Sequence, residues 1–236
     1  MVTAVGADVR TVSVGDRVTV PFVSGCGECA DCATGRAQVC KFQWQPGFHG
    51  PGSFAEAVAV PWADFNIVAL PDSLPFDVAA GLGCRFATAY RGIAHVGKVE
   101  AGETVAVFGC GGVGLAAIMV AKSRGARVVA IDRSHAALDR ARLAGADERI
   151  DAHYDNVVAE VRTFGGQGVD LTMDAIGSVD TARMSIESLR RGGRHVQAGL
   201  LPAPVIGDHA TIPMHLVIAY ELTVHGTHRS EEHTSE

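Results

Sequence analysis

The chain has 236 residues, of which 47% are hydrophobic and 19% charged, so a sizeable apolar core forms and wholesale disorder is excluded. A net charge of −6 leaves no global basic field that would hold a nucleic acid backbone. The longest apolar runs, at 79–82 and 113–121, are too short to span a bilayer, and the first residues carry no signal peptide pattern. These features predict a cytoplasmic protein with neither a membrane nor a nucleic acid partner.

The first third of the chain is rich in β-type residues. Short strands are predicted at 17–21, 54–60 and 66–70, each bounded by turn residues. Prolines and then an alanine-rich stretch follow at 71–94, where we predict helical turns that bridge two halves of the chain.

After residue 100 the pattern becomes strand, glycine turn and helix, repeated along the chain. Strands are predicted at 104–108, 127–131, 149–151, 169–174, 195–198 and 222–225. Helices are predicted at 112–124, 135–143, 155–164 and 179–190. Strands that alternate with helices indicate an α/β domain with a doubly wound parallel sheet, covered by helices on both faces.

Four cysteines lie close together in a polar loop at 24–42. They are Cys26, Cys29, Cys32 and Cys40. Structural zinc takes four tetrahedral ligands, commonly all thiolates, and a loop with so little apolar content needs a metal to fold. The spacing favours a structural zinc site over four cysteines that bind nothing. Since protein would supply all four ligands, this metal would have no open position for chemistry.

A glycine-rich segment follows the predicted strand at 104–108 and precedes a predicted helix. Its glycines are Gly109, Gly111, Gly112 and Gly114. This is the G-x-G-x-x-G pattern of dinucleotide-binding proteins with one extra glycine. The first glycine turns the chain, the second admits the pyrophosphate, and the last lets the helix pack on the strand. An ordinary glycine turn is the alternative, and the strand-to-helix context favours nucleotide binding.

Asp132 ends the next predicted strand, 18 residues after Gly114. A carboxylate in this place accepts hydrogen bonds from an adenosine ribose and repels a 2′-phosphate, so it favours NAD over NADP. Arg133 follows at once and would soften that preference. Cys110, inside the glycine segment, is predicted to be a small apolar filler.

Taken together, these motifs resemble the zinc-dependent alcohol dehydrogenases of the medium-chain dehydrogenase/reductase superfamily. The resemblance extends from residue 2 to residue 228 and includes the segment Gly83-Cys84-Arg-Phe-Ala-Thr88-Ala-Tyr90 between the cysteine loop and the glycine segment. It implies a doubly wound Rossmann sheet preceded by a partial, β-rich GroES-like catalytic domain. The implied domains are 1–72 with the zinc lobe at 24–42, a bridging helical segment at 73–100, and a nucleotide domain at 101–228.

The resemblance also implies site residues and an activity. Cys84 matches a ligand of a second, catalytic zinc, although an alanine-rich helix alone would make it a buried structural cysteine. The same match places five residues beside the nicotinamide: Thr88, Val113, Ala198, Gly199 and Leu200. The implied reaction is hydride transfer between NAD and a small alcohol, aldehyde or ketone, in a protein that forms homo-oligomers.

The chain departs from the family pattern at both ends. The upstream cysteine and the Gly-His-Glu segment of the family do not occur, so we expect Cys84 to lack its co-ligands and this chain to be inactive. The last eight residues, 229–236, resemble the translation of a sequencing-adapter sequence, which predicts a non-native tail. Met1 falls in mid-strand by family pattern, which indicates truncation there too.

Two other functions stay open at this level. A quinone or enoyl reductase of the same superfamily needs no zinc, and such enzymes usually lack both the cysteine lobe and the equivalent of Cys84. A non-enzymatic zinc module, such as a zinc-ribbon nucleic acid binder, fits neither the acidic charge nor the nucleotide-type segment.

Overall fold

The computed structural model describes residues 1–153, 156–201 and 212–227. The chain divides into two compact units, Met1–Ala87 and Thr88–Thr227. The predicted tail at 229–236 lies outside the described residues. None of the described helices has the length and apolar character needed to cross a bilayer.

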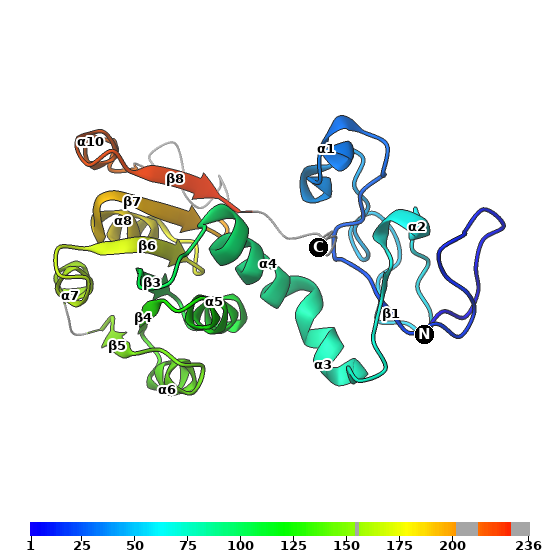
Figure 1. Ribbon diagram of the computed structural model, residues 1–236, viewed down its shortest axis with the longest axis horizontal. Helices are drawn as coiled ribbons and strands as arrows, with labels where there is room; N and C mark the ends of the chain where they lie inside the picture. The colour runs from blue at the N-terminus through cyan, green and yellow to red at the C-terminus, as the bar shows by residue number, and fades with distance from the viewer. Residues whose placement is uncertain (154–155, 202–211, 228–236) are drawn as a thin grey trace. The chain divides into compact units, whose positions relative to one another are not determined.

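The second unit contains one six-stranded sheet, whose strands lie in the order β5-β4-β3-β6-β7-β8 (Figure 1). The strands are β3 (Thr104–Phe108), β4 (Arg127–Asp132), β5 (Glu148–Asp151), β6 (Val169–Asp174), β7 (Leu189–Gln197) and β8 (Thr223–Gly226). Every neighbouring pair is parallel. This arrangement confirms the doubly wound α/β fold, in which the chain starts at the centre and builds outward in both directions.

Among the described residues, the helices that follow β3 in the same unit number five. They are α5 (Gly112–Ser123), α6 (His135–Leu143), α7 (Val157–Phe164), α8 (Val179–Glu187) and α10 (Met214–Ala219). Polar residues cap three of them: Ser134 precedes α6, Asn156 precedes α7, and Ser178 forms a capping box with Thr181 at the start of α8. Each cap satisfies backbone N–H groups that the first helical turn leaves without intrahelical partners.

Helices cover both faces of the sheet because side chains alternate along each strand. Phe108 of β3 and Ile131 of β4 share one buried core with Val161 of α7 and Ile186 of α8. Val107 points to the opposite face, where the first turn of α5 packs against it. Every residue of β3 is buried, as expected for the central strand of a parallel sheet.

The first unit has little regular structure. Its two strands, β1 (Val18–Thr19) and β2 (Val68–Ala69), pair antiparallel. Its short helical segments are α1 (Ala30–Ala33), η1 (Ala37–Val39), α2 (Ala63–Asn66), α3 (Phe76–Gly81) and η2 (Leu82–Phe86). Helical structure continues through α4 (Ala87–Tyr90) and η3 (Arg91–Val96), which confirms the helical turns predicted around 71–94.

Several predicted elements are wrong in the structure. The segment 54–60 is not a strand, although its residues alternate, because a strand requires a neighbouring backbone and none of the described residues pairs with it. The strands predicted at 17–21 and 66–70 shrink to the two residues that do pair. Helix α8 ends at Glu187 rather than 190, because Leu189 pairs with Val169 and is buried as the start of β7.

Candidate functional site

The four cysteines converge in the first unit. Their sulfur atoms all lie within 4.8 Å of one another. Sγ–Sγ distances are 4.0 Å for Cys26 and Cys32, 3.7 Å for Cys29 and Cys40, and 3.6 Å for Cys26 and Cys40. Four sulfurs bound tetrahedrally at about 2.3 Å from a zinc ion are about 3.8 Å apart. The cluster therefore fits a zinc ion at its centre.

The surroundings of these thiols also suit a metal. Burial raises the pKa of the Cys32 thiol to about 12 and also raises the pKa of Cys40, whereas a backbone hydrogen bond from Glu28 lowers the pKa of Cys26 to about 7. The backbone N–H groups of Cys26 and Phe42 point at Sγ of Cys40, at 3.5 and 3.4 Å. Such N–H groups stabilise a thiolate, and a zinc ion supplies the positive charge that buried thiolates require.

Asn66 holds the base of the cysteine lobe, residues 24–42. Only 1% of Asn66 is exposed, and its side chain forms hydrogen bonds with both backbone groups of Gly25. The N–H of Gly25 donates to Oδ1 at 2.8 Å, and Nδ2 donates to the Gly25 carbonyl at 2.9 Å. A Cβ on Gly25 would come within 2.8 Å of the Ala37 side chain and 3.0 Å of the Cys32 sulfur. The lobe therefore depends on one buried amide and one glycine as well as on its cysteines.

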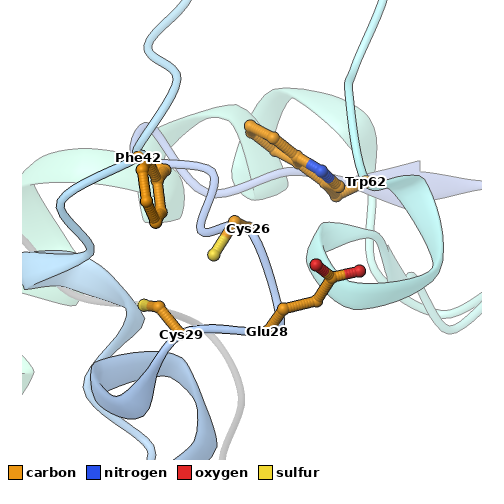
Figure 2. Close-up of a pocket in the computed structure, with 5 residues that line it drawn as sticks. All are labelled: Cys26, Glu28, Cys29, Phe42 and Trp62. Carbon is orange, nitrogen blue, oxygen red and sulfur yellow. The ribbon is translucent and has the colours of Figure 1, made fainter.

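A shallow hollow lies beside the cluster, as Figure 2 shows. Phe42 and Trp62 flank Cys26 in this view, and the Glu28 carboxylate points away from the sulfurs. Because four cysteines complete a tetrahedral zinc site, no position on the metal is left for a substrate. The geometry is that of a structural site rather than a catalytic one.

The predicted glycine segment connects β3 to α5 in the second unit. Gly109 turns the chain at φ +92°, and a Cβ there would lie 2.5 Å from Cγ1 of Ile176. A Cβ on Gly114 would overlap the carbonyl oxygen of Gly109, so only glycine lets α5 approach the strand this closely. Gly111 and Gly112 are exposed, and no side chain caps this end of the helix. Its first N–H groups are thus available to a phosphate.

Asp132 lies at the carboxyl end of β4 and contacts the glycine segment. Its Oδ2 accepts the N–H of Cys110 at 2.7 Å, and its Oδ1 accepts the N–H of Ser134 at 2.8 Å. A carboxylate has about four acceptor positions, so two remain for other donors. Arg133 is exposed next to it. Cys110 is fully buried, and burial raises its pKa to about 12, which agrees with its prediction as a packing residue.

The residues assigned to the nicotinamide lie on different elements. Val113 is half-buried in the first turn of α5, and 198–200 follow β7 at the carboxyl edge of the sheet. Thr88 is buried in α4. Cys84 is exposed in η2, a π-helical turn, and belongs to no group of three or more metal-binding side chains among the described residues.

Comparison with known proteins gives two family matches. The alcohol dehydrogenase GroES-like domain matches residues 1–72, and the zinc-binding dehydrogenase family matches residues 112–236, more than half of the chain. The chain belongs to the zinc-binding dehydrogenase family. This membership confirms the predicted resemblance and excludes a stand-alone zinc module, because the matches extend far beyond the cysteine lobe.

Individual members of the zinc-binding dehydrogenase family resemble the chain over most of its length. An alcohol dehydrogenase of Geobacillus stearothermophilus is 35% identical over 202 residues, which cover 85% of this chain and 59% of the relative. An L-threonine 3-dehydrogenase of Sinorhizobium fredii (strain NBRC 101917 / NGR234) is 35% identical over 201 residues, 84% of this chain and 57% of the relative. The chain thus spans less than two thirds of the length of these curated relatives.

A solved structure gives the same result. The alcohol dehydrogenase TADH from Thermus sp. ATN1 matches with a TM-score of 0.87 and 34% identity, over 95% of this chain and 65% of that one. The relatives are dehydrogenases, which are oxidoreductases, and the structural match agrees with the fold described above.

Sequence patterns did not reveal two groups of residues near these sites. Asn66 bonds a glycine 41 residues away, and no spacing rule connects the two. The buried Asp174 and His195 form a polar network with the half-buried Gln197 at the carboxyl edge of the sheet. The only signal in the sequence was the presence of polar residues within strands that otherwise read as apolar.

Proposed function

We propose that the protein to which this chain belongs transfers hydride between NAD and a small alcohol or carbonyl compound. The observation that carries this proposal is the glycine segment, in which α5 presents uncapped N–H groups while Asp132 is held beside the same turn. This arrangement suits a pyrophosphate on the helix and an adenosine ribose on the carboxylate.

Each part of the cofactor has a proposed partner in the second unit. The backbone at Gly109, Gly111, Gly112 and Gly114 receives the pyrophosphate, and Asp132 accepts hydrogen bonds from the ribose hydroxyls. Since a carboxylate there repels a 2′-phosphate, NAD is preferred over NADP, with Arg133 reducing the difference. Thr88, Val113 and the segment 198–200 are assigned to the nicotinamide by family resemblance. In this proposal the structural zinc is bound within 1–72 and the nucleotide within 101–228. The helical segment 73–100 connects these two domains.

The chain supplies different numbers of ligands to the two zinc sites of the family. Cys26, Cys29, Cys32 and Cys40 would hold the structural zinc, which stabilises the lobe and takes no part in chemistry. A catalytic zinc, which activates an alcohol oxygen, needs about three protein ligands, and Cys84 alone does not meet that requirement. For this chain we therefore expect one zinc ion, nucleotide binding and no alcohol oxidation, while substrate turnover and homo-oligomer formation belong to the proposal for the whole protein.

Calorimetric titration with NADH and NADPH tests the nucleotide assignment. We expect NADH to bind more tightly than NADPH. Asp132→Gly should lower the ratio of the two affinities by roughly tenfold to a hundredfold, because it removes hydrogen bonds to a charged group. Asp139→Asn removes an exposed carboxylate of α6 and should leave both affinities unchanged. Failure of the folded chain to bind NADH, or tighter binding of NADPH, would overturn the proposal.

A zinc determination on the same protein distinguishes the remaining alternative. One zinc ion per chain supports the zinc-type dehydrogenase, and a zinc-free chain with an ordered lobe supports the quinone or enoyl reductase. Formation of NADH from a panel of primary and secondary alcohols by this chain would contradict the expectation that Cys84 lacks its co-ligands.

A further inference from the structure

Asp174 is a fully buried carboxylate at the carboxyl end of β6. No ion pair of the described residues includes it. Four hydrogen-bond donors surround it instead. Oδ1 accepts the N–H groups of Ile176 at 2.8 Å and Gly177 at 3.1 Å, and Oδ2 accepts the Thr181 hydroxyl and Nε2 of Gln197, both at 3.0 Å. These four bonds use the full acceptor capacity of a carboxylate.

The same residue connects two loops. Its side chain orders the turn 175–178 between β6 and α8, while its backbone carbonyl accepts the N–H groups of Ala198 at 2.9 Å and Gly199 at 2.8 Å. Gln197, which donates to the Asp174 carboxylate, also donates to the carbonyl of Gly199 at 3.0 Å. Asp174 and Gln197 together therefore hold the segment 198–200 against the turn.

Contacts between the two loops leave no room for side chains. A Cβ on Gly177 would overlap the Leu200 carbonyl oxygen, and a Cβ on Gly199 would overlap the Gly177 nitrogen. Ile176, in the same turn, packs on Gly109 at the start of the glycine segment. The N–H of Ala175 donates to the carbonyl of Phe108 at 2.9 Å. A shift of this turn would thus displace the exit of β7, where the segment 198–200 begins.

The network beyond Gln197 has one consistent hydrogen-bond pattern. Since Nε2 of Gln197 donates twice, its Oε1 is the acceptor for Nε2–H of His195, at 3.1 Å. Nδ1 of His195 then has one lone pair, which the hydroxyls of Thr172 and Ser185, both at 3.0 Å, share as donors. This neutral tautomer agrees with the lowering of the His195 pKa by burial. The ring fixes the orientation of the Gln197 amide.

We infer that Asp174 is a positioning residue for the nicotinamide half of the dinucleotide site. It acts through the segment 198–200, and it leaves the adenosine half, held by Asp132, unaffected. This inference rests on the proposed function, which assigns 198–200 to the nicotinamide. An asparagine at 174 keeps the size but places an amide N–H₂ against donors, and rotating Gln197 to meet it would set Oε1 against the Gly199 carbonyl.

The test compares NADH with ADP-ribose, which lacks the nicotinamide, by calorimetric titration of the full chain. Wild type should bind NADH more tightly than ADP-ribose. Asp174→Asn should weaken NADH binding by about tenfold and leave ADP-ribose within about twofold, so that the ratio of the two affinities approaches one. If Asp174→Asn does not fold, Gln197→Met takes its place in the test. It removes the bonds to Asp174 and to Gly199 and should lower the same ratio.

Asp170→Asn is the matched control. Asp170 lies at the amino end of the same strand and accepts hydrogen bonds from Thr104 and Arg190, so its loss should lower the melting temperature without changing either affinity. Equal weakening of NADH and ADP-ribose by Asp174→Asn, or no weakening of NADH, overturns the inference alone. If folded wild type binds neither ligand, the proposed function fails, and this inference fails with it.

Discussion

The two units of the chain differ in what stabilises them. In Thr88–Thr227, six parallel strands are covered by helices, and residues such as Phe108, Ile131 and Leu171 are fully or almost fully buried. In Met1–Ala87, one pair of two-residue strands is the only ladder among the described residues, and three of the few buried side chains are thiols. Apolar burial stabilises the first kind of structure by itself, whereas the second kind needs a metal at its centre.

This difference has a consequence for function. The nucleotide site lies on the ends of strands that a large core holds in place, so its geometry does not require the metal. The cysteine lobe contacts its surroundings through the bonds of Asn66 to Gly25, the paired backbones of Ser24 and Trp44, and the ring of Phe65. Loss of zinc should therefore unfold the lobe and leave nucleotide binding intact.

The largest expected effect comes from breaking the metal cluster. Cys40→Ser removes a buried sulfur that accepts two backbone N–H groups, and zinc contributes folding free energy directly, on the order of 10 kcal/mol in small zinc domains. We expect zinc content to fall from one ion per chain to none and amide exchange at 24–42 to become fast, with exchange in β3 and β6 unchanged. Metal analysis and hydrogen–deuterium exchange measure both. Cys84→Ser, at an exposed cysteine outside the cluster, should retain the zinc.

Slow exchange at 24–42 in the zinc-free variant would contradict the comparison between the units. It would show that backbone and side-chain contacts hold the lobe without its metal. Faster exchange in β3 would show instead that the stability of the nucleotide unit depends on the lobe.

How far the sequence predicts the molecule follows the same division. The strands and helices from β3 to β6 could be predicted because each carries its own local pattern, whereas β7 begins at Leu189, six residues before the predicted strand at 195–198. The glycine segment and Asp132 follow from the order of these elements. The cysteine site could be predicted from spacing alone, since four thiols within 15 residues lie within reach of one ion. These features depend on interactions between residues close in sequence.

Features that depend on distant residues were missed or wrong. The alternation at 54–60 describes a segment able to pair, but it carries no information on whether a neighbouring strand is present. Helix α10 has six residues, too few for a periodic pattern to show. Asp174 and Gln197 are 23 residues apart on neighbouring strands, so only the fold brings the carboxylate to its donor.

A medium effect is expected from Asn66→Ala. It leaves the buried N–H and C=O of Gly25 without partners, which costs about 1–3 kcal/mol. Mutation of a residue that supports the ligands of a metal typically lowers metal affinity by roughly tenfold to a hundredfold. Competition with a chelator should show weaker zinc binding by that factor. Asn156→Ala is the matched change in the other unit, where loss of the α7 cap costs about 1 kcal/mol and should leave zinc affinity unchanged. Equal zinc affinity in both variants would remove Asn66 from the account of the lobe.

The smallest expected effect concerns pH and the nucleotide unit. Burial lowers the pKa of His195, while the Gln197 side chain and the Asp174 charge raise it and His225 on β8 lowers it further, for a net lowering below 6.5. The unfolded chain therefore binds a proton at a higher pH than the folded one. The contribution of neutral His195 to the free energy of unfolding is complete above about pH 7. It is lost as the pH falls through 6.5 toward the folded pKa, at up to about 1.4 kcal/mol per pH unit.

Urea unfolding of the nucleotide unit at pH 7.5 and pH 5.5 measures this contribution. Wild type should lose more stability than His195→Gln over that interval, by up to about 1.4 kcal/mol for the one pH unit below 6.5, because glutamine at 195 does not titrate. The comparison uses the change with pH, so any constant cost of the substitution cancels. His135→Gln removes an exposed histidine paired with Asp151 and should retain the wild-type pH dependence attributed to His195. If His195→Gln shows the same loss as wild type, His195 is protonated as readily in the folded chain as in the unfolded one, and the neutral tautomer assigned to the network is wrong.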